Sequence, residues 1–344
     1  MKTTALPILA GLTTGLLSPC VAQPATNQPV YPSIGQVVYQ DARLEKLIPK
    51  GTPIEVLASG FVWSEGPIWI KEGNYLLFSD VPQNVIFKWS EQEGLSEFLK
   101  PSGYTGHEYY SEEPGSNGLT LDRQGRLIAC EHGDRRVTAM PLTGGGKLTL
   151  ADRYQGKRFH SPNDVVQHPT QNSYYFTDPP YGLPKRQDDP SQELPHYGVY
   201  RVTPDGNVTL LISDLTRPNG LAFSPDGRTL YVAQSDPEKA ILMAYPVQND
   251  GTLGKGRLFF DATSMVKQGL PGLPDGLKLD KDGNVWTTGP GGVLILSPEG
   301  KLLGRIDTKQ ATANCAWGND GSTLYITADG YLCRIRTNAR GAGF

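Results

Sequence analysis

The chain has little of what several classes of protein require. It carries four cysteines in 344 residues, and its formal net charge is −3, from 32 basic and 35 acidic side chains. No run of Lys and Arg supplies the concentrated positive charge that phosphate binding needs, which excludes nucleic acid as a partner. Helical spacing of hydrophobic residues is almost absent, and only "DARLEKLI" from Asp41 predicts a short helix. No GxSxG motif occurs, so a serine nucleophile on a sharp turn is excluded as well.

The longest hydrophobic run lies at the N-terminus and is too short to span a bilayer. A lysine precedes the apolar residues 5–17, and the small residue Ala22 follows a short polar tail. This order predicts a secretory signal peptide over residues 1–22, followed by an N-terminal extension over residues 23–40. Cys20 offers an alternative, as a site of lipid attachment. We therefore expect an exported protein, periplasmic or secreted, without a transmembrane span.

Three cysteines remain after such a cleavage: Cys130, Cys315 and Cys333. An odd number at wide spacing does not make a disulfide framework and matches no metal-binding motif. We expect buried free thiols, with at most one bridge among them.

Glycine and proline are abundant, and they separate short apolar stretches as in an all-β chain with many turns. One pattern occurs six times. It begins with a residue that has a side-chain oxygen, which is followed in most copies by a glycine. Two short strands with a turn between them come next. Successive copies are separated by 52, 46, 56, 56 and 39 residues. Repeats of this length predict a six-bladed β-propeller with four-stranded antiparallel blades, as a single domain over residues 41–344. Two packed β-sandwich domains are the alternative.

The stretch "TPIEVLASGF" from Thr52 has no partner within its own copy. We expect it to pair with the last copy and close the ring, which removes two open sheet edges. A closed ring predicts a monomer.

The residues that open the six copies all carry a side-chain oxygen. They are Glu65, Asn117, Asn163, Asn219, Asp275 and Asn314. Because the first strand of each blade lines the central channel, these anchor residues are expected at one mouth of it. Carboxylate and amide oxygens suit a hard cation, and Ca²⁺ takes six to eight of them. The alternative is that Asn-Gly and Asp-Gly are ordinary turn dipeptides.

The second strand of each copy is expected to return to the same mouth. The residues at its end are Asp80, Glu131 with His132, Asp178, Gln234 and Thr288. Two long polar loops, 103–116 and 179–197, open on this face, as loops that shape a substrate site do. His132 could act as a general acid or base or bind a substrate hydroxyl, and a structural histidine bonded to loop backbone is the alternative.

With these residues in place, the sequence resembles the SMP-30/gluconolactonase family of six-bladed propellers over roughly residues 41–337. The resemblance is carried by "WSEGPIW" around Glu65, "CEHGDRRV" from Cys130, "SPNDVV" around Asn163, "TDPPYGL" from Thr177, "RPNGLAFSPDG" around Asn219 and "PDGLKLD" around Asp275.

The resemblance implies a divalent cation, usually Ca²⁺, and hydrolysis of sugar lactones. It implies as metal ligands Glu65, Asn163, Asn219 and Asp275. Asp275 is also implied in proton transfer. Animal members carry a substrate-binding Arg where this chain has Ser161, so sugar recognition must differ here. The substrate contacts that the resemblance suggests instead are Glu131, His132, Asp178 and Tyr181. The anchor residue Asn117 is a further candidate for contact with substrate.

The resulting hypothesis is a metal-dependent lactonase that acts on a small-molecule lactone. The cation polarises the lactone carbonyl, and water activated by Asp275 or His132 attacks it to give the hydroxy acid. Mg²⁺, Mn²⁺ or Zn²⁺ are alternatives to Ca²⁺. An organophosphate or other ester hydrolase, a plant-type condensing enzyme and a non-enzymatic, calcium-stabilised binding propeller are the alternative functions.

Overall fold

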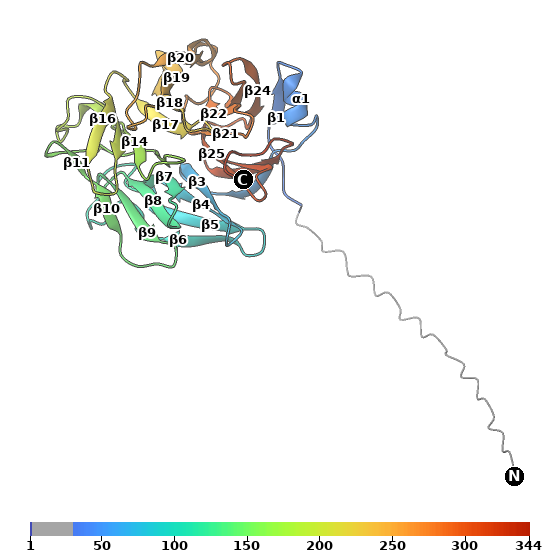
Figure 1. Ribbon diagram of the computed structural model, residues 1–344, viewed down its shortest axis with the longest axis horizontal. Helices are drawn as coiled ribbons and strands as arrows, with labels where there is room; N and C mark the ends of the chain where they lie inside the picture. Colours follow the sequence, from blue (N-terminus) through green and yellow to red (C-terminus); the bar gives the residue numbers. More distant parts are fainter. Residues whose placement is uncertain (2–29) are drawn as a thin grey trace. The chain divides into compact units, whose positions relative to one another are not determined.

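Six antiparallel β-sheets follow one another along the chain and are arranged around a central channel (Figure 1). The computed structural model of the protein describes Met1 and residues 30–344, and residues 31–344 form one compact unit. The predicted all-β, six-bladed propeller is confirmed. Apart from Met1, the predicted signal peptide lies outside the described residues, and so does Cys20.

Blades 1 to 3 are built from consecutive strands. Blade 1 consists of β3 (Ser64–Ile70), β4 (Tyr75–Asp80), β5 (Val85–Ser90) and β6 (Gly94–Leu99). Blade 2 consists of β7 (Ser116–Leu121), β8 (Arg126–Glu131), β9 (Arg136–Pro141) and β10 (Leu148–Ala151). Blade 3 consists of β13 (Val165–Gln167), β14 (Tyr174–Asp178), β15 (Gly198–Val202) and β16 (Val208–Ile212). A separate two-stranded ribbon, β11 (Arg153–Tyr154) with β12 (Lys157–Arg158), lies between blades 2 and 3 in the sequence.

Blades 4 to 6 complete the ring. Blade 4 consists of β17 (Pro218–Phe223), β18 (Thr229–Asp236), β19 (Lys239–Pro246) and β20 (Arg257–Asp261). Blade 5 contains β21 (Leu277–Leu279), β22 (Val285–Gly289), β23 (Gly292–Leu296) and β24 (Leu302–Asp307). Blade 6 contains β25 (Thr312–Gly318), β26 (Thr323–Ala328) and β27 (Tyr331–Arg336). The helical segments of the described chain are α1 (Arg43–Leu47), α2 (Thr263–Lys267) and the 3-10 turn η1 (Arg186–Asp188). None of these is long and apolar enough to cross a membrane.

The N-terminal segment supplies strands to two blades. Strand β2 (Glu55–Ser59) pairs with β27, so the expected closure of the ring by "TPIEVLASGF" is confirmed. Strand β1 (Gln36–Tyr39) pairs with β24 and gives blade 5 a fifth strand. The segment over residues 36–39, which the sequence analysis placed in an extension before the propeller, is therefore hydrogen-bonded to blade 5.

An ion-pair network holds the closing blade. Arg334 of β27 is buried, and its Nε donates to the carboxylate of Glu55 on β2 at 2.6 Å, while its Nη1 donates to Glu91 after β5 at 2.5 Å. The guanidinium also lies 4.9 Å from the ring centroid of Tyr31. One cation thus ties β27 to the N-terminal strand and to blade 1.

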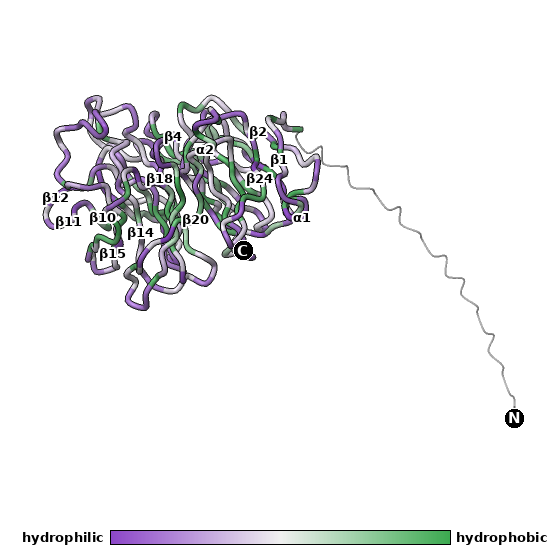
Figure 2. Tube along the Cα trace, turned by 90° about the horizontal axis from the view of Figure 1, so that it is seen from above, coloured by the Kyte–Doolittle hydropathy of each residue, from purple (hydrophilic) through white to green (hydrophobic). Residues whose placement is uncertain are grey.

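The hydrophobic core is divided into layers between neighbouring blades, and Figure 2 shows hydrophobic residues concentrated in the blades while many connecting loops are hydrophilic. Trp69 of blade 1 stacks on Tyr325 of blade 6 at 5.3 Å between ring centroids. The three cysteines of the described chain are buried and free, as expected.

Candidate active site

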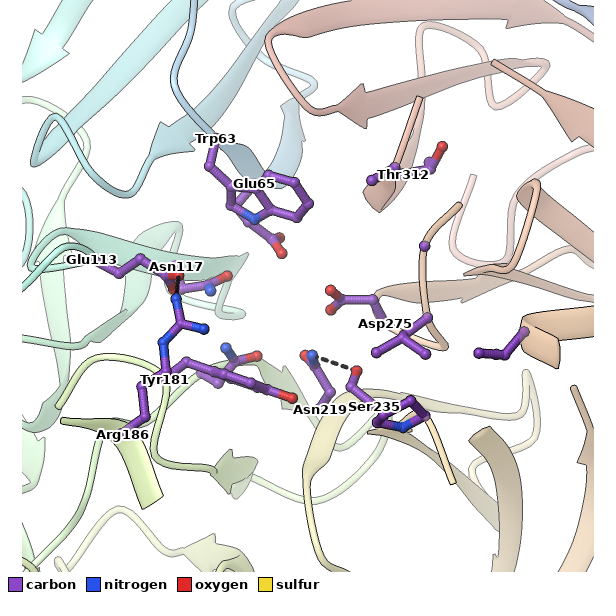
Figure 3. Close-up of a pocket in the computed structure, with 16 residues that line it drawn as sticks. Trp63, Glu65, Glu113, Asn117, Tyr181, Arg186, Asn219, Ser235, Asp275 and Thr312 are labelled. Carbon is purple, nitrogen blue, oxygen red and sulfur yellow. Dashed lines mark hydrogen bonds and ion pairs between the residues drawn. The ribbon is translucent and has the colours of Figure 1, made fainter. Parts of the chain in front are cut away.

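A cavity of about 470 Å³ opens at the mouth of the channel where the inner strands begin (Figure 3). Anchor residues of the first five copies line it: Glu65, Asn117, Asn163, Asn219 and Asp275. The remaining lining residues are Trp63, Glu113, Tyr181, Arg186, Ser235, Pro237, Val266, Gly272, Leu273, Ala311 and Thr312. The sequence pattern therefore brought the predicted ring of oxygen-bearing side chains to one place.

The inner strands turn these side chains inward by irregular pairing. The register between β3 and β4 shifts just after Glu65, and that between β17 and β18 shifts across Asn219. Such a β-bulge re-aims a side chain that regular alternation would place elsewhere. Asn163 and Asp275 reach the same position differently, because each precedes the short inner strand of its blade.

The glycine after an anchor is required by the close approach of neighbouring blades. A Cβ on Gly220 would lie 2.1 Å from the carbonyl oxygen of Asp275, and one on Gly66 would lie 2.0 Å from that of Asn117. Both contacts are with backbone, which cannot move aside. The anchor-Gly dipeptide therefore serves the packing of inner strands around the channel, in addition to any turn that it favours.

Two buried carboxylates face each other across the cavity (Figure 3). Burial, together with the nearby carboxyl of Asp164, raises the pKa of Glu65 to about 7. Burial, and then the charge of Glu65, also raises the pKa of Asp275. Among the described residues that line the cavity, Arg186 is the only cation, and it is paired with Glu113 at 3.1 Å. The two central carboxylates thus have no cationic partner among the described residues that line the cavity.

Glu65 is held in place by neighbours on two blades. Its Oε2 accepts hydrogen bonds from the backbone N–H of Gly66 at 2.8 Å and from Nδ2 of Asn314 at 3.2 Å. Asn314, the sixth anchor, therefore orients Glu65 instead of lining the cavity itself. Oε1 of Glu65 is left for a ligand.

The amide of Asn219 carries an oxygen with no hydrogen-bond partner among the described residues. Its Nδ2 donates to Oγ of Ser235 at 2.9 Å, whereas its Oδ1 is buried and unpaired. A buried acceptor without a partner costs about 1–3 kcal/mol, so such an atom indicates a ligand. Two unneutralised carboxylates and amide oxygens form the donor set of a hard cation such as Ca²⁺, and the residues present fit one.

The amides are necessary for that fit. Within the described part of the chain, no three His, Cys, Asp or Glu side chains gather closely enough to hold a metal ion by themselves. A cation at this mouth would depend on neutral oxygens from Asn219 and its neighbours as well as on the two carboxylates.

Comparison with known proteins places the chain in a family. Residues 63–330 match the sequence profile described as "SMP-30/Gluconolactonase/LRE-like region". The chain belongs to this family. It is 40% identical over 325 residues to a gluconolactonase from Zymomonas mobilis, covering 93% of this chain and 91% of the relative.

Solved structures agree with this membership. A gluconolactonase from Xanthomonas campestris superposes with a TM-score of 0.75 at 31% identity, covering 90% of this chain and 99% of the other. The calcium-binding protein regucalcin from Agrobacterium tumefaciens shares the fold, with a TM-score of 0.66 at 20% identity over 84% of this chain and 94% of the other.

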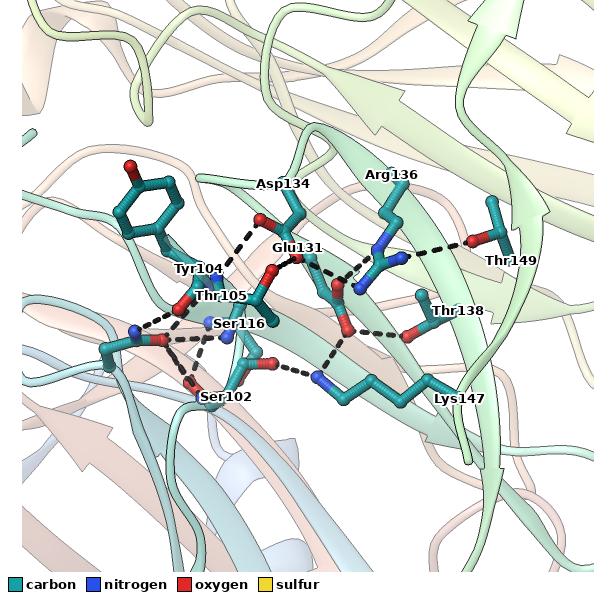
Figure 4. Close-up of polar contacts among 12 residues, drawn as sticks. Ser102, Tyr104, Thr105, Ser116, Glu131, Asp134, Arg136, Thr138, Lys147 and Thr149 are labelled. Carbon is teal, nitrogen blue, oxygen red and sulfur yellow. Dashed lines mark hydrogen bonds and ion pairs between the residues drawn. The ribbon is translucent and has the colours of Figure 1, made fainter. Parts of the chain in front are cut away.

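In this SMP-30/gluconolactonase propeller, three residues predicted to contact substrate do not line the cavity: Glu131, His132 and Asp178. Both oxygens of the buried Glu131 carboxylate are occupied, by Arg136, Thr138 and Lys147 (Figure 4). Lys147 also donates to the carbonyl of Ser102, so the network ties blade 2 to the start of a long loop. The substrate role expected of Glu131 is corrected to this structural one.

Asp178 has a similar structural role. Its carboxylate accepts hydrogen bonds from the backbone N–H groups of His160 and Ser161, at 2.9 and 2.8 Å. Asp80 does the same for Val62 and Trp63 in blade 1. These carboxylates hold the segment that leads into the inner strand, and the expected substrate contact of Asp178 is corrected.

In blade 4 a neighbour of the expected residue enters the cavity. Successive side chains of a strand point to opposite faces, and Ser235 lines the cavity where Gln234 was expected. Trp63, Glu113 and Arg186 were not singled out either, although the last two lie in the predicted long loops.

His132 is buried and does not line the cavity. Its Nδ1 lies 3.2 Å from the carbonyl oxygen of Glu113, and its Nε2 lies 3.4 Å from Nδ2 of Asn163. Burial lowers the pKa of His132 to about 4, so the ring is neutral near pH 7. A ring with both nitrogens engaged has no atom free to take a proton from water, which argues against a general base.

The two long loops meet above the cavity. Arg186 in the loop over residues 179–197 pairs with Glu113 in the loop over residues 103–116 (Figure 3). Asn84 fixes the first loop, because its Oδ1 accepts three successive backbone N–H groups from Ser102 onward. The loops are thereby joined at their tips and anchored at a base.

Proposed function

We propose that this member of the family, a lactonase, hydrolyses a sugar lactone to its hydroxy acid with a divalent cation, Ca²⁺, at the channel mouth. The supporting observation is the pair of buried carboxylates, Glu65 and Asp275, beside the unpaired oxygen of Asn219. The gluconolactonase relatives support the substrate class, and the calcium-binding relative supports the ion. The signal-peptide pattern supports a reaction in the periplasm or outside the cell.

The ligands proposed for the ion are Glu65, Asn163, Asn219 and Asp275. When bound, the cation supplies Lewis acidity to the lactone carbonyl. An ion that takes six to eight oxygen ligands would keep positions for water and substrate beside these four residues. The cavity, at about 470 Å³, is large enough for a monosaccharide lactone.

Asp275 is the residue proposed to move the proton. Its carboxylate projects into the cavity, where water attacking the lactone carbonyl carbon loses a proton to it (Figure 3). Cleavage of the ring C–O bond then returns that proton to the leaving oxygen, which gives the open hydroxy acid. Burial, and next the charge of Glu65, raise the pKa of Asp275 above its ordinary value, which makes this carboxylate a stronger base.

Polar groups of the cavity wall would orient the sugar. Burial, with the adjacent Asp275 charge, raises the pKa of Tyr181, so its hydroxyl stays protonated and can donate to a substrate oxygen. Asn117 adds an amide to the cavity wall. Trp63 offers an apolar ring face of the kind that packs against sugars.

The test is hydrolysis of D-glucono-δ-lactone followed by pH-stat. Purified protein is stripped with chelator and titrated with Ca²⁺, beside Asp275→Asn and the matched control Asp282→Asn, which alters an exposed carboxylate of the same blade. Activity should vanish with the metal, return on titration, survive in the control and collapse in Asp275→Asn. Full activity in Asp275→Asn would contradict its role, and turnover indifferent to chelator would contradict the cation.

A further inference from the structure

The side-chain amides of Asn163 and Asn219, in the cavity wall, could each present either the oxygen or the NH₂ group to the cavity. An amide presents an oxygen at one end and an NH₂ group at the other, and only the oxygen can bind a cation. The two ends have almost the same size, so packing alone does not select between them. Hydrogen bonds must make the selection, and the structure contains one relay for each amide.

The first relay orients Asn219. The hydroxyl of Ser235 donates to the backbone carbonyl oxygen of Pro274, the residue just before Asp275. A hydroxyl has one proton, so with it engaged, Oγ can only accept from Asn219. The Nδ2 of Asn219 donates to this Oγ at 2.9 Å, which turns Oδ1 of Asn219 toward the cavity. There Oδ1 has no hydrogen-bond partner within the described chain.

The second relay orients Asn163. A carbonyl oxygen only accepts, so the Nδ1 of His132 beside the Glu113 carbonyl must carry the proton. In a neutral imidazole the other nitrogen, Nε2, is then an acceptor. It faces Nδ2 of Asn163, so Oδ1 is the end of that amide left for the cavity that Asn163 lines.

Both relays have the same construction: a backbone carbonyl, a polar side chain and an asparagine NH₂ group. The carbonyl fixes the direction of every hydrogen bond because it cannot donate. Each relay also joins two blades. His132 follows β8 of blade 2 and reaches Asn163 at the start of blade 3, while Ser235 of blade 4 reaches the segment entering blade 5.

We propose that His132 and Ser235 are positioning residues that fix the amides of Asn163 and Asn219 with Oδ1 toward the cation. The inference rests on the proposed cation site, and it replaces the general-base role considered for His132. Groups that hydrogen-bond to metal ligands set the ligand orientation, and their loss typically reduces metal affinity by about 10–100-fold.

The experiment measures Ca²⁺ affinity by titration calorimetry in His132→Leu, in two backgrounds. In the wild-type background Kd should rise about tenfold, the lower end of the range for loss of a group that hydrogen-bonds to a metal ligand. In the Asn163→Asp background the two ligand oxygens are equivalent and need no orientation. In that background, His132→Leu should leave the Kd for Ca²⁺ within about twofold. In the wild-type background, His132→Gln should recover part of the Ca²⁺ affinity that His132→Leu loses, because its amide offers both a donor and an acceptor.

Two further variants make the test robust. Ser235→Ala with and without Asn219→Asp repeats the cycle on the independent relay, should His132→Leu fold poorly. His168→Gln is the matched control, because His168 is also buried and its Nδ1 accepts backbone N–H groups of Thr170 and Gln171 away from the cavity. It should lower thermal stability without changing Kd.

The outcomes separate the two ideas. Wild-type Ca²⁺ affinity in His132→Leu and Ser235→Ala, or an equal loss in the asparagine and aspartate backgrounds, would overturn the relays while the cation site stands. A wild-type protein that binds no Ca²⁺ would overturn the cation of the proposed function and the relays with it.

Discussion

Replacing Asn219 by leucine should change the stability of the protein in opposite directions with and without Ca²⁺. Without a cation, the buried Oδ1 lacks a partner, which costs about 1–3 kcal/mol. Leucine has nearly the same shape and removes that cost, while it gives up the bond from Nδ2 to Ser235, worth about 0.5–1.5 kcal/mol. The cation-free variant should therefore be as stable as the wild type or more stable, by up to about 2 kcal/mol.

With Ca²⁺ the order should reverse. A ligand present at a thousand times its Kd stabilises the native state by about 4 kcal/mol. A change of 1 kcal/mol moves Tm by roughly 2 °C in a domain of this size. The wild type should gain about 8 °C on saturation, and Asn219→Leu, lacking a ligand, should gain little.

The assay is thermal denaturation followed by circular dichroism in chelator and across a Ca²⁺ series. Asn249→Leu, an exposed turn position outside the cavity, serves as control and should keep the full calcium-dependent rise. A variant clearly less stable than the wild type in chelator would refute the unpaired state of Oδ1. An undiminished rise with Ca²⁺ would refute Asn219 as a ligand.

Three further substitutions distinguish structural from functional polar groups. Glu131→Gln breaks a buried ion pair, so it should lower the free energy of unfolding by about 3 kcal/mol. KM for the lactone should stay unchanged, and a raised KM would show that Glu131 contacts the substrate. Arg186→Gln separates the loop tips at Glu113, and because the Arg186 side chain is about half exposed, stability should change by less than about 1 kcal/mol. KM should rise severalfold, and an unchanged KM would show that the pair does not shape the cavity. Arg334→Met removes the cation that bridges Glu55 and its neighbours, and urea denaturation should show a loss of about 3 kcal/mol, whereas no loss would exclude a role in ring closure.

The sequence was sufficient for the blades and for the place of the anchors. The repeat predicted both, because each copy must pack on the next and its inner strand must begin at the channel. The fifth strand of blade 5 was missed because residues 36–39 form one short segment with no second copy to compare.

The chemistry around the anchors was harder to predict, since it depends on contacts between blades. In β18 it is Ser235, beside the expected Gln234, that enters the channel and accepts a hydrogen bond from Asn219. The link from His132 to Asn163 joins residues of different blades, and no local pattern encodes it. Such partners become visible only when the ring is assembled.

Ring closure has a consequence for how the protein is made. The strand β2 ends at Ser59, but its partner β27 begins at Tyr331, so this pairing waits until almost the whole chain has left the ribosome. Blades 1 to 4 are contiguous and can form in the order of synthesis, whereas β2 has an unpaired edge throughout. Contacts of such long sequence separation form slowly, and an exposed strand edge invites pairing with other chains. The closing blade is thus the step at which assembly of the newly made chain is most vulnerable to aggregation.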